Sequence, residues 1–176
     1  MRLRFVTLDV FTQTRLSGNP LAVVIDADGL EQPRMQAVAR EFNLPETVFV
    51  LQPANQEHRA RLRIFTPANE LPFAGHPTVG TALLLGCMTA SANTRGFVLE
   101  EPIGLVHCRV TSHGHDGGHA KFTVPRLPAE AGSAPDRKAV AGALGLSEDD
   151  IGFGEFRCAL VLCGARAVHI RPGRVA

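Results

Sequence analysis

Several residue types are scarce or missing in this sequence of 176 residues. It has no tryptophan and no tyrosine, so phenylalanine alone provides large aromatic rings, and few platforms exist on which nucleic-acid bases could stack. Charge of one sign is not in excess either, because 18 Lys and Arg face 17 Asp and Glu, which gives a net charge of +1. Without a strong basic field, a dedicated nucleic-acid-binding function is disfavoured.

Long hydrophobic runs and paired cysteines are also lacking. The longest apolar stretch lies around residues 79–85, far short of the roughly 20 residues that a membrane-spanning helix needs. The first residues, MRLRFVTLDVF, carry charges and no continuous apolar region, unlike a signal peptide. The four cysteines are scattered, without a C-x-x-C pair. We therefore expect a cytoplasmic protein with reduced thiols and no membrane partner.

What the sequence does contain is a mixture of strand and helix patterns. Met35, Val38, Ala39 and Phe42 share one face of a helix that is predicted to begin near Pro33. A second, short helix is predicted over 137–146, where Gly145 ends it. Alternating or β-branched apolar residues predict strands over 2–11, 21–26, 46–51, 60–66, 96–101, 104–110 and 120–125. The fold class is therefore α+β.

The segment after Pro77, TVGTALLLGCM, is apolar or small on every side and carries no charge. A helix with this composition is expected to be buried all round. Because strands flank it in the sequence, we expect a curved, largely antiparallel sheet to wrap around it. Residues 1–112 are predicted to form this lobe.

A candidate ligand site lies where a loop delivers Gly75 and His76 to the start of this helix, with Pro77 in its first turn. The free N–H groups and the dipole of a helix N-terminus favour an anion such as a carboxylate. Gly75 would let such a ligand approach the backbone closely. A plain joint between loop and helix explains these residues equally well.

Other side chains with chemical potential are less specific. Glu46, at the start of an apolar strand, is suited to acid/base work if water is partly excluded, but most such acids are simply solvated. His76 could orient a substrate, shuttle a proton or cap the helix. The spacing of His113, His115 and His119 could suit a metal, but their glycine-rich segment favours a solvated loop, so we expect no metal site.

Four longer segments carry a family resemblance: DVFT at 9–12, SGNPLAVV at 17–24, EFNLPETVFV at 41–50, and RIFTPANELPFAGHPTVGTALLL at 63–85. With weaker matches up to about residue 150, the sequence resembles the phenazine biosynthesis-like isomerases, within the diaminopimelate-epimerase-like fold. The resemblance implies two pseudo-symmetric lobes, so residues 113–176 are expected to form a linker and the incomplete start of the second lobe. Each lobe is a curved, mostly antiparallel sheet around a central helix, and the active site lies in the cleft between the lobes.

The resemblance also implies roles for individual residues. Glu46 matches the family's catalytic acid/base, and Asn19 a position near the bound substrate. Gly75, His76 and Pro77 belong to the A-G-H-P motif, in which the histidine contacts the substrate and the glycine backbone approaches it.

The activity implied is the movement of a proton and a double bond within a small carboxylate substrate, without cofactor or metal. Racemising relatives use a cysteine where this chain has Ala74, so a two-thiol racemase is disfavoured. A homodimer is one option for the assembly.

The family's second lobe contributes an Asp and a G-S-A-type segment to the cleft, and no D-P-A-T-G-S-like motif occurs in the sequence up to Ala176. We therefore expect a truncated chain that is inactive alone. Val-His-Ile-Arg-Pro-Gly at 168–173 can be encoded so that a shift of one base reads Phe-Thr-Phe-Val-Pro-Val, a strand typical of the family. This suggests an out-of-frame tail from roughly residue 155. The alternative is a catalytically silent lobe that binds a carboxylate or a protein partner.

Overall fold

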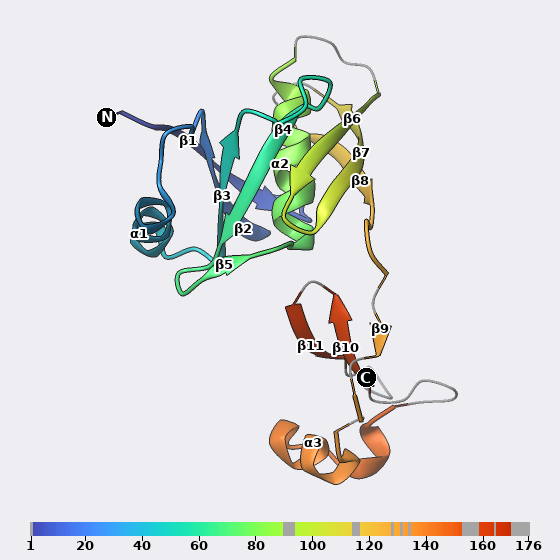
Figure 1. Cartoon of the computed structure of the whole chain (residues 1–176). Helices are drawn as coiled ribbons and strands as arrows, with labels where there is room; N and C mark the ends of the chain where they lie inside the picture. Colours follow the sequence, from blue (N-terminus) through green and yellow to red (C-terminus); the bar gives the residue numbers. More distant parts are fainter. Residues whose placement is uncertain are drawn as a thin grey trace. The chain divides into compact units, whose positions relative to one another are not determined.

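A computed structural model gives the fold of the chain (Figure 1). The chain divides into two compact units, residues 1–125 and 126–176, and each is considered by itself. The structure describes residues 2–89, 94–113, 117–127, 129–130, 132–133, 135–152, 159–163 and 165–169, the last two ranges by their backbone alone.

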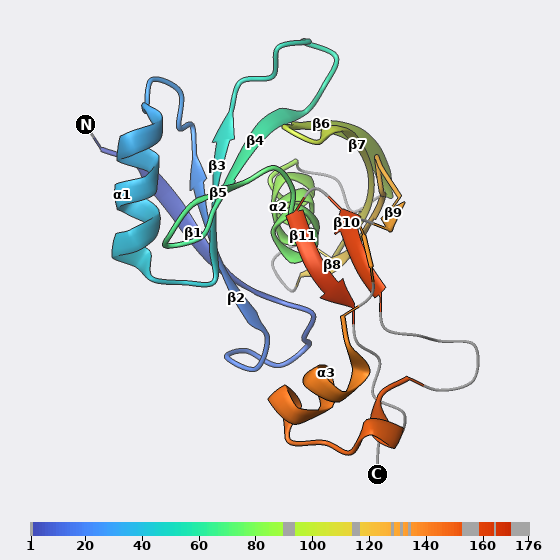
Figure 2. The same ribbon diagram turned by 60° about the horizontal axis from the view of Figure 1, so that its bottom comes forward.

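The first unit is built on one curved, mixed sheet (Figures 1 and 2). Neighbouring strands are antiparallel except for two parallel pairs, β2 with β3 and β4 with β6. The predicted mostly antiparallel sheet is thereby confirmed. In spatial order its strands are β1 (Arg4–Val10), β2 (Asn19–Ile25), β3 (Glu46–Leu51), β4 (Ala60–Phe65), β6 (Arg95–Glu101), β7 (Gly104–Ser112) and β8 (Gly118–Thr123), with the short β5 (Glu70–Leu71) beside β4.

Helix α2 (Gly75–Cys87) lies inside the curve of this sheet (Figure 2). It packs closely because it carries glycines at its contacts. A Cβ atom on Gly80 would lie 2.7 Å from Val10 Cγ2, and one on Gly86 would lie 2.6 Å from Val110 Cγ1. Leu85, 4% exposed, points into the same core. The helix thus joins the strands at both ends of the sheet to one hydrophobic core.

The prediction that α2 is buried on every side is wrong for one face. Val79, Leu83 and Leu84 are only half-buried, although they pack against the core. The reason lies in the sheet, whose path ends at β1 and β8 and does not close around the helix. A composition that is apolar all round therefore shows that the helix is internal to its fold, but not that one lobe covers it completely.

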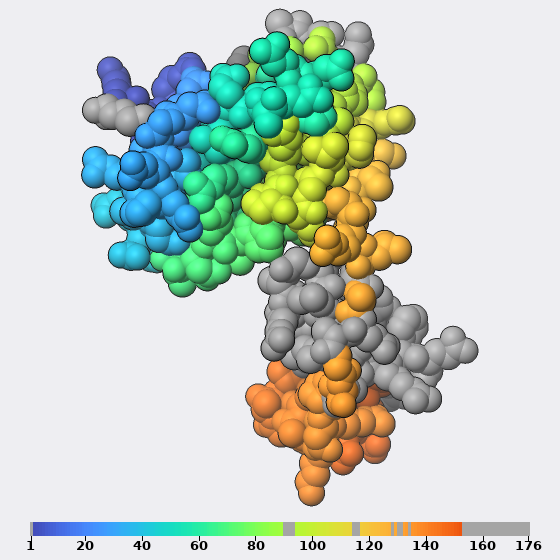
Figure 3. Space-filling model, viewed as in Figure 1, coloured from blue at the N-terminus to red at the C-terminus, as the bar shows by residue number. Residues whose placement is uncertain are grey.

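Helix α1 (Gln32–Phe42) covers the opposite, convex face, and Figure 3 shows it on the surface of the first unit. Its buried residues Met35 and Ala39 pack with Phe49 and Phe65 of the sheet. Proline stands in its first turn, and the helix ends at Asn43, which adopts the left-handed conformation with φ of 52°. The predicted amphipathic helix is confirmed.

The described part of the second unit contains two short helices and a small sheet. α3 (Arg137–Leu144) begins with the Asp136 side chain accepting a hydrogen bond from the Ala139 N–H and ends at Gly145. The 3₁₀ helix η2 (Glu148–Asp150) follows it. Strands β11 (Ala165–His169), β10 (Ala159–Cys163) and β9 (Ala129–Glu130) form an antiparallel sheet in this order.

Two sequence-based expectations concern the boundary between the units and the tail. The boundary expected at residue 112 falls between β7 and β8, which pair with each other, and the first unit continues to Pro125. The expected out-of-frame tail from about 155 lies mainly outside the described residues, and only the backbone of β10 and β11 is described in it.

Candidate active site

Two side chains that are 30 positions apart in the sequence meet on the concave side of the sheet. Glu46 begins β3 in register with Leu21 of β2, and paired residues point to the same face. Leu21 points toward α2, because its Cδ2 lies 2.8 Å from where a Gly80 Cβ would be. Glu46 therefore faces the helix. His76, in the first turn of α2, places its Nε2 3.4 Å from Glu46 Oε2.

The polar atoms of this pair are shielded from water but are not satisfied by hydrogen bonds within the described residues. The side chains of His76 and Glu46 are 9% and 18% exposed. Neither Glu46 Oε2 nor His76 Nε2 has a hydrogen-bond partner among the described residues. A buried polar atom left without a partner costs about 1–3 kcal/mol, so such atoms are frequent where a site serves function rather than stability.

The start of α2 beside this pair is open. Ala74 occupies the N-cap position and forms no side-chain cap, as alanine has no acceptor to offer the first N–H groups. A Cβ atom on Gly75 would meet nothing within 4 Å. Pro77 is buried and fixes the backbone angle of the first turn. The N–H groups of Gly75 and His76 thus lie beside free space at the start of a helix, an arrangement that suits a carboxylate, and Pro77 holds the first turn in place.

Asn19 lies on the same side of the sheet as the pair. It begins β2, two residues before Leu21, and is half-buried opposite Val10 of β1. Residues two apart on a strand share a face and are about 7 Å apart, so Asn19 is a near neighbour of Glu46 on the concave face. Gly18 precedes it because a Cβ there would lie 2.6 Å from the Val10 carbonyl oxygen. The site residues predicted from the sequence, Asn19, Glu46 and Gly75 to Pro77, therefore lie on one side of the lobe.

Glu101, the last residue of β6, was missed by the sequence analysis. Its side chain is directed to α2, where Oε1 lies 2.8 Å from Thr78 Oγ1, and the residue is only 7% exposed. Burial raises the pKa of Glu101 to about 7, against a smaller lowering by the Thr78 hydroxyl. Burial first, and the nearby Glu101 second, raise the pKa of the Cys108 thiol to about 12. The sequence signal that could have indicated a buried Glu101 is its alternation with the apolar Phe97 and Leu99 along the strand.

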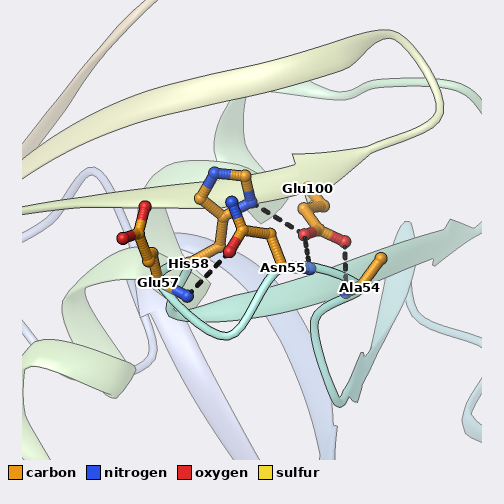
Figure 4. Close-up of polar contacts among 5 residues, drawn as sticks. All are labelled: Ala54, Asn55, Glu57, His58 and Glu100. Carbon is orange, nitrogen blue, oxygen red and sulfur yellow. Dashed lines mark hydrogen bonds and ion pairs between the residues drawn. The ribbon is translucent and has the colours of Figure 1, made fainter.

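The neighbouring Glu100 points to the convex face and has a structural role (Figure 4). Its carboxylate accepts hydrogen bonds from the N–H groups of Ala54 and Asn55 and lies 2.7 Å from His58 Nδ1. The two backbone N–H groups and then His58 lower the pKa of Glu100 to about 2. This carboxylate anchors the loop between β3 and β4. It points to the face of the sheet opposite the Glu46–His76 pair.

The described residues contain no cluster of three or more His, Cys, Asp or Glu side chains that could hold a metal ion. His113 and His119 lie with ring centres 6.0 Å apart, whereas His115 is outside the described residues. Within the same part of the chain, no helix combines the length and apolar character needed to cross a membrane.

Known proteins are similar to this chain in sequence and in fold. An uncharacterized isomerase of Mesorhizobium japonicum is 50% identical over 167 residues, which are 94% of this chain and 55% of the relative. The trans-2,3-dihydro-3-hydroxyanthranilate isomerase of Pseudomonas aeruginosa is 57% identical over 86 residues, 49% of this chain and 31% of that enzyme. The chain thus spans about half the length, or less, of these relatives.

A solved structure described as a predicted epimerase from Pseudomonas aeruginosa matches with a TM-score of 0.83 at 33% identity, covering 97% of this chain and 60% of that one. This match supports the epimerase-like lobe expected from the sequence. Residues 8–171 match the family model for phenazine biosynthesis-like proteins. The chain therefore belongs to the phenazine biosynthesis-like family.

Proposed function

We propose that the lobe formed by residues 1–125 supplies the acid/base groups of an isomerase that moves a proton, and with it a double bond, within a small carboxylate substrate. The observation that carries the proposal is the Glu46–His76 pair, with its unpartnered buried atoms, beside the uncapped start of α2. The Mesorhizobium and Pseudomonas relatives are named as isomerases, which supports the same reaction class.

The proposed reaction begins with a substrate carboxylate at the N–H groups of Gly75 and His76, where the helix dipole favours negative charge. Glu46 as carboxylate removes a proton from one carbon, and the electron pair of the broken C–H bond shifts the double bond. The protonated Glu46 then returns the proton to another carbon. His76 contacts the carboxyl group and orients it. Because the proton and the electron pair stay within the substrate and Glu46, no oxidant or reductant takes part.

The positions of the cysteines support an isomerase over a two-thiol racemase. Ala74 occupies the place at which racemising relatives are expected to use cysteine. Cys87 lies at the opposite end of α2, and Cys108 is buried with a raised pKa, so its thiolate is scarce. These described cysteines are therefore poor candidates for proton transfer at the pair.

The test uses a chimera in which residues 1–125 replace the matching segment of the Mesorhizobium relative. Trans-2,3-dihydro-3-hydroxyanthranilate, the substrate named for the Pseudomonas enzyme, is the probe, and incorporation of solvent deuterium into carbon positions is the readout. Glu46→Gln should lower incorporation about 10²–10⁴-fold and leave binding nearly unchanged. Unchanged incorporation in Glu46→Gln would show that another group is the base.

A second candidate is a lobe that binds a carboxylate without turning it over, which the open space at Gly75 also favours. Calorimetry of the 176-residue chain with 3-hydroxyanthranilate separates the two functions. Binding by a chain whose chimera incorporates no deuterium would support this second candidate. Incorporation that requires Glu46 would support the isomerase.

A further inference from the structure

Glu101 is a buried carboxyl group for which the proposed reaction has no use. It extends from the end of β6 toward the first turn of α2, and its Oε2 has no hydrogen-bond partner among the described residues. In the same part of the chain, no basic side chain forms an ion pair with it. An unpaired carboxylate in such a place is costly, so the group must contribute in a neutral form or have a partner outside this lobe.

The hydrogen bonds around Thr78 indicate which form is present. Thr78 Oγ1 lies 2.8 Å from Glu101 Oε1 and 2.8 Å from the Ala74 carbonyl oxygen. A hydroxyl group has a single proton to donate, and both of these neighbours are oxygen atoms. The two contacts become separate hydrogen bonds, each with its own proton, when Glu101 is protonated and donates to Thr78, which in turn donates to Ala74. The chain of donors then runs from β6 to the N-cap of α2.

A second contact ties the same two parts of the molecule together. The N–H of Ile103, in the turn after β6, donates to the Pro72 carbonyl oxygen at 3.1 Å. The Thr78 N–H also donates to Ala74, at 3.2 Å. The β6–β7 turn therefore holds the segment from Pro72 to Thr78 at both ends, and His76 lies between these points.

We propose that Glu101 is a positioning residue of the site: acting through Thr78, it fixes the first turn of α2 and so places His76 against Glu46. This inference rests on the proposed function for naming the Glu46–His76 pair as the reacting groups. The physical link itself requires only the hydrogen bonds from Glu101 to Ala74.

The surroundings of Glu101 agree with a protonated carboxyl group. The titratable group that faces it from β7 is the Cys108 thiol, and α2 faces it with the neutral Thr78. Glu100, the next residue on its own strand, points to the other face of the sheet. Burial raises the pKa of Glu101 to about 7, so the proton is retained in weakly acidic solution.

The test is an NMR comparison of the full 176-residue chain with Glu101→Leu, Thr78→Val, the double variant and Glu101→Gln at about pH 6. Two readouts need no turnover: the imidazole ¹⁵N shifts of His76, assigned with His76→Asn, and the hydrogen-exchange rate of the Thr78 N–H. Glu101→Leu and Thr78→Val each interrupt the donor chain. Both should shift the His76 signals and speed exchange of the Thr78 N–H on the order of five- to tenfold.

The double variant should go no further than either single one, because all interrupt the same chain. Glu101→Gln, whose amide can donate to Thr78, should rescue both readouts. If Glu101→Leu does not fold, Thr78→Val decides in its place. Unchanged His76 signals and Thr78 exchange in the folded variants would overturn the inference, and so would a Glu101→Gln variant that behaves like Glu101→Leu. A chimera without isomerase activity would instead count against the proposed function and leave these readouts intact.

Discussion

The two faces of the sheet place neighbouring carboxyl groups of β6 in opposite conditions. On the convex face, Glu100 accepts hydrogen bonds from two backbone N–H groups and lies beside His58, and its pKa falls to about 2. On the concave face, Glu101 is buried beside one hydroxyl group, and its pKa rises to about 7. The first environment makes a permanent anion that holds a loop. The second makes a group that can keep a proton near neutral pH and donate it to a neighbouring hydroxyl group.

The helices on the two faces also differ in how completely their polar and apolar groups are satisfied. On the convex side, α1 buries one stripe of side chains and leaves the rest to water. On the concave side, α2 is uncapped at its start, holds His76 against Glu46, and keeps a half-buried apolar face. Most of the buried polar atoms that lack a hydrogen-bond partner among the described residues thus lie inside the curve, together with the larger hydrophobic core. The following predictions are ordered by expected effect.

Leu85→Asp should destabilise the lobe by more than about 3 kcal/mol, because it places an unpaired carboxylate in the concave core. Leu16→Asp is the matched control, since Leu16 is 94% exposed and should tolerate the change. The half-buried Leu84 should give an intermediate loss. Urea unfolding followed by circular dichroism measures the series. A Leu85→Asp protein as stable as the Leu16→Asp control would contradict the buried face of α2.

The pH dependence of stability should separate Glu101 from Glu100. Glu101 has a folded pKa of about 7, above its ordinary 4.5, so its stabilising contribution is complete below about pH 4.5 and is lost as the pH rises through 7. The loss is on the order of 3 kcal/mol. Glu101→Gln should remove it, which makes the variant more stable than wild type at about pH 8.

Glu100 should show the opposite sign. Its folded pKa of about 2 lies below 4.5, so its contribution is present above pH 4.5 and is lost as the pH falls toward 2. Glu100→Gln should therefore flatten the acid side of the profile and lower stability at neutral pH, where the slope of the profile stays unchanged. Urea titrations at about pH 3, 5 and 8 measure both variants. Identical profiles for the two would break the comparison of the faces.

Two glycines of α2 should respond differently to alanine. Gly80→Ala forces a methyl group against Val10 and Leu21, and should cost about 1–3 kcal/mol despite the better helix propensity of alanine. Gly75→Ala enters free space and should change stability by less than about 0.5 kcal/mol. It should nevertheless weaken carboxylate binding by about tenfold. Thermal melts and calorimetry check the pair, and unweakened binding by Gly75→Ala would argue against a ligand at the helix start.

Local pattern was sufficient for much of this fold. The spacing of Met35, Val38, Ala39 and Phe42 predicted α1, and the uncharged segment after Pro77 predicted an internal helix. The meeting of Glu46 and His76 was expected from the family resemblance, since no periodicity relates a strand start to a distant helix start.

Other features depend on pairing that a linear pattern does not contain. The half-buried face of α2 follows from a sheet that ends at β1 and β8. Glu100 and Glu101 are adjacent acids at a hairpin end, a pattern typical of solvated side chains. Alternation along β6 directs them to opposite faces, but the sequence does not show that α2 buries one and that the β3–β4 loop binds the other. Arg63 alternates with apolar residues along β4, a pattern typical of a solvent-facing side chain, but it is half-buried and donates two hydrogen bonds to Glu70. Each of these depends on which strands become neighbours.

The most direct test of the account compares one carboxylate from each face in the deuterium-incorporation assay of the chimera. Glu46→Gln changes the concave face, and Glu41→Gln changes an exposed carboxylate of α1 on the convex side. The account predicts that Glu46→Gln lowers incorporation about 10²–10⁴-fold whereas Glu41→Gln leaves it within about twofold. Equal incorporation by the two variants would contradict the claim that the concave face carries the proton transfer.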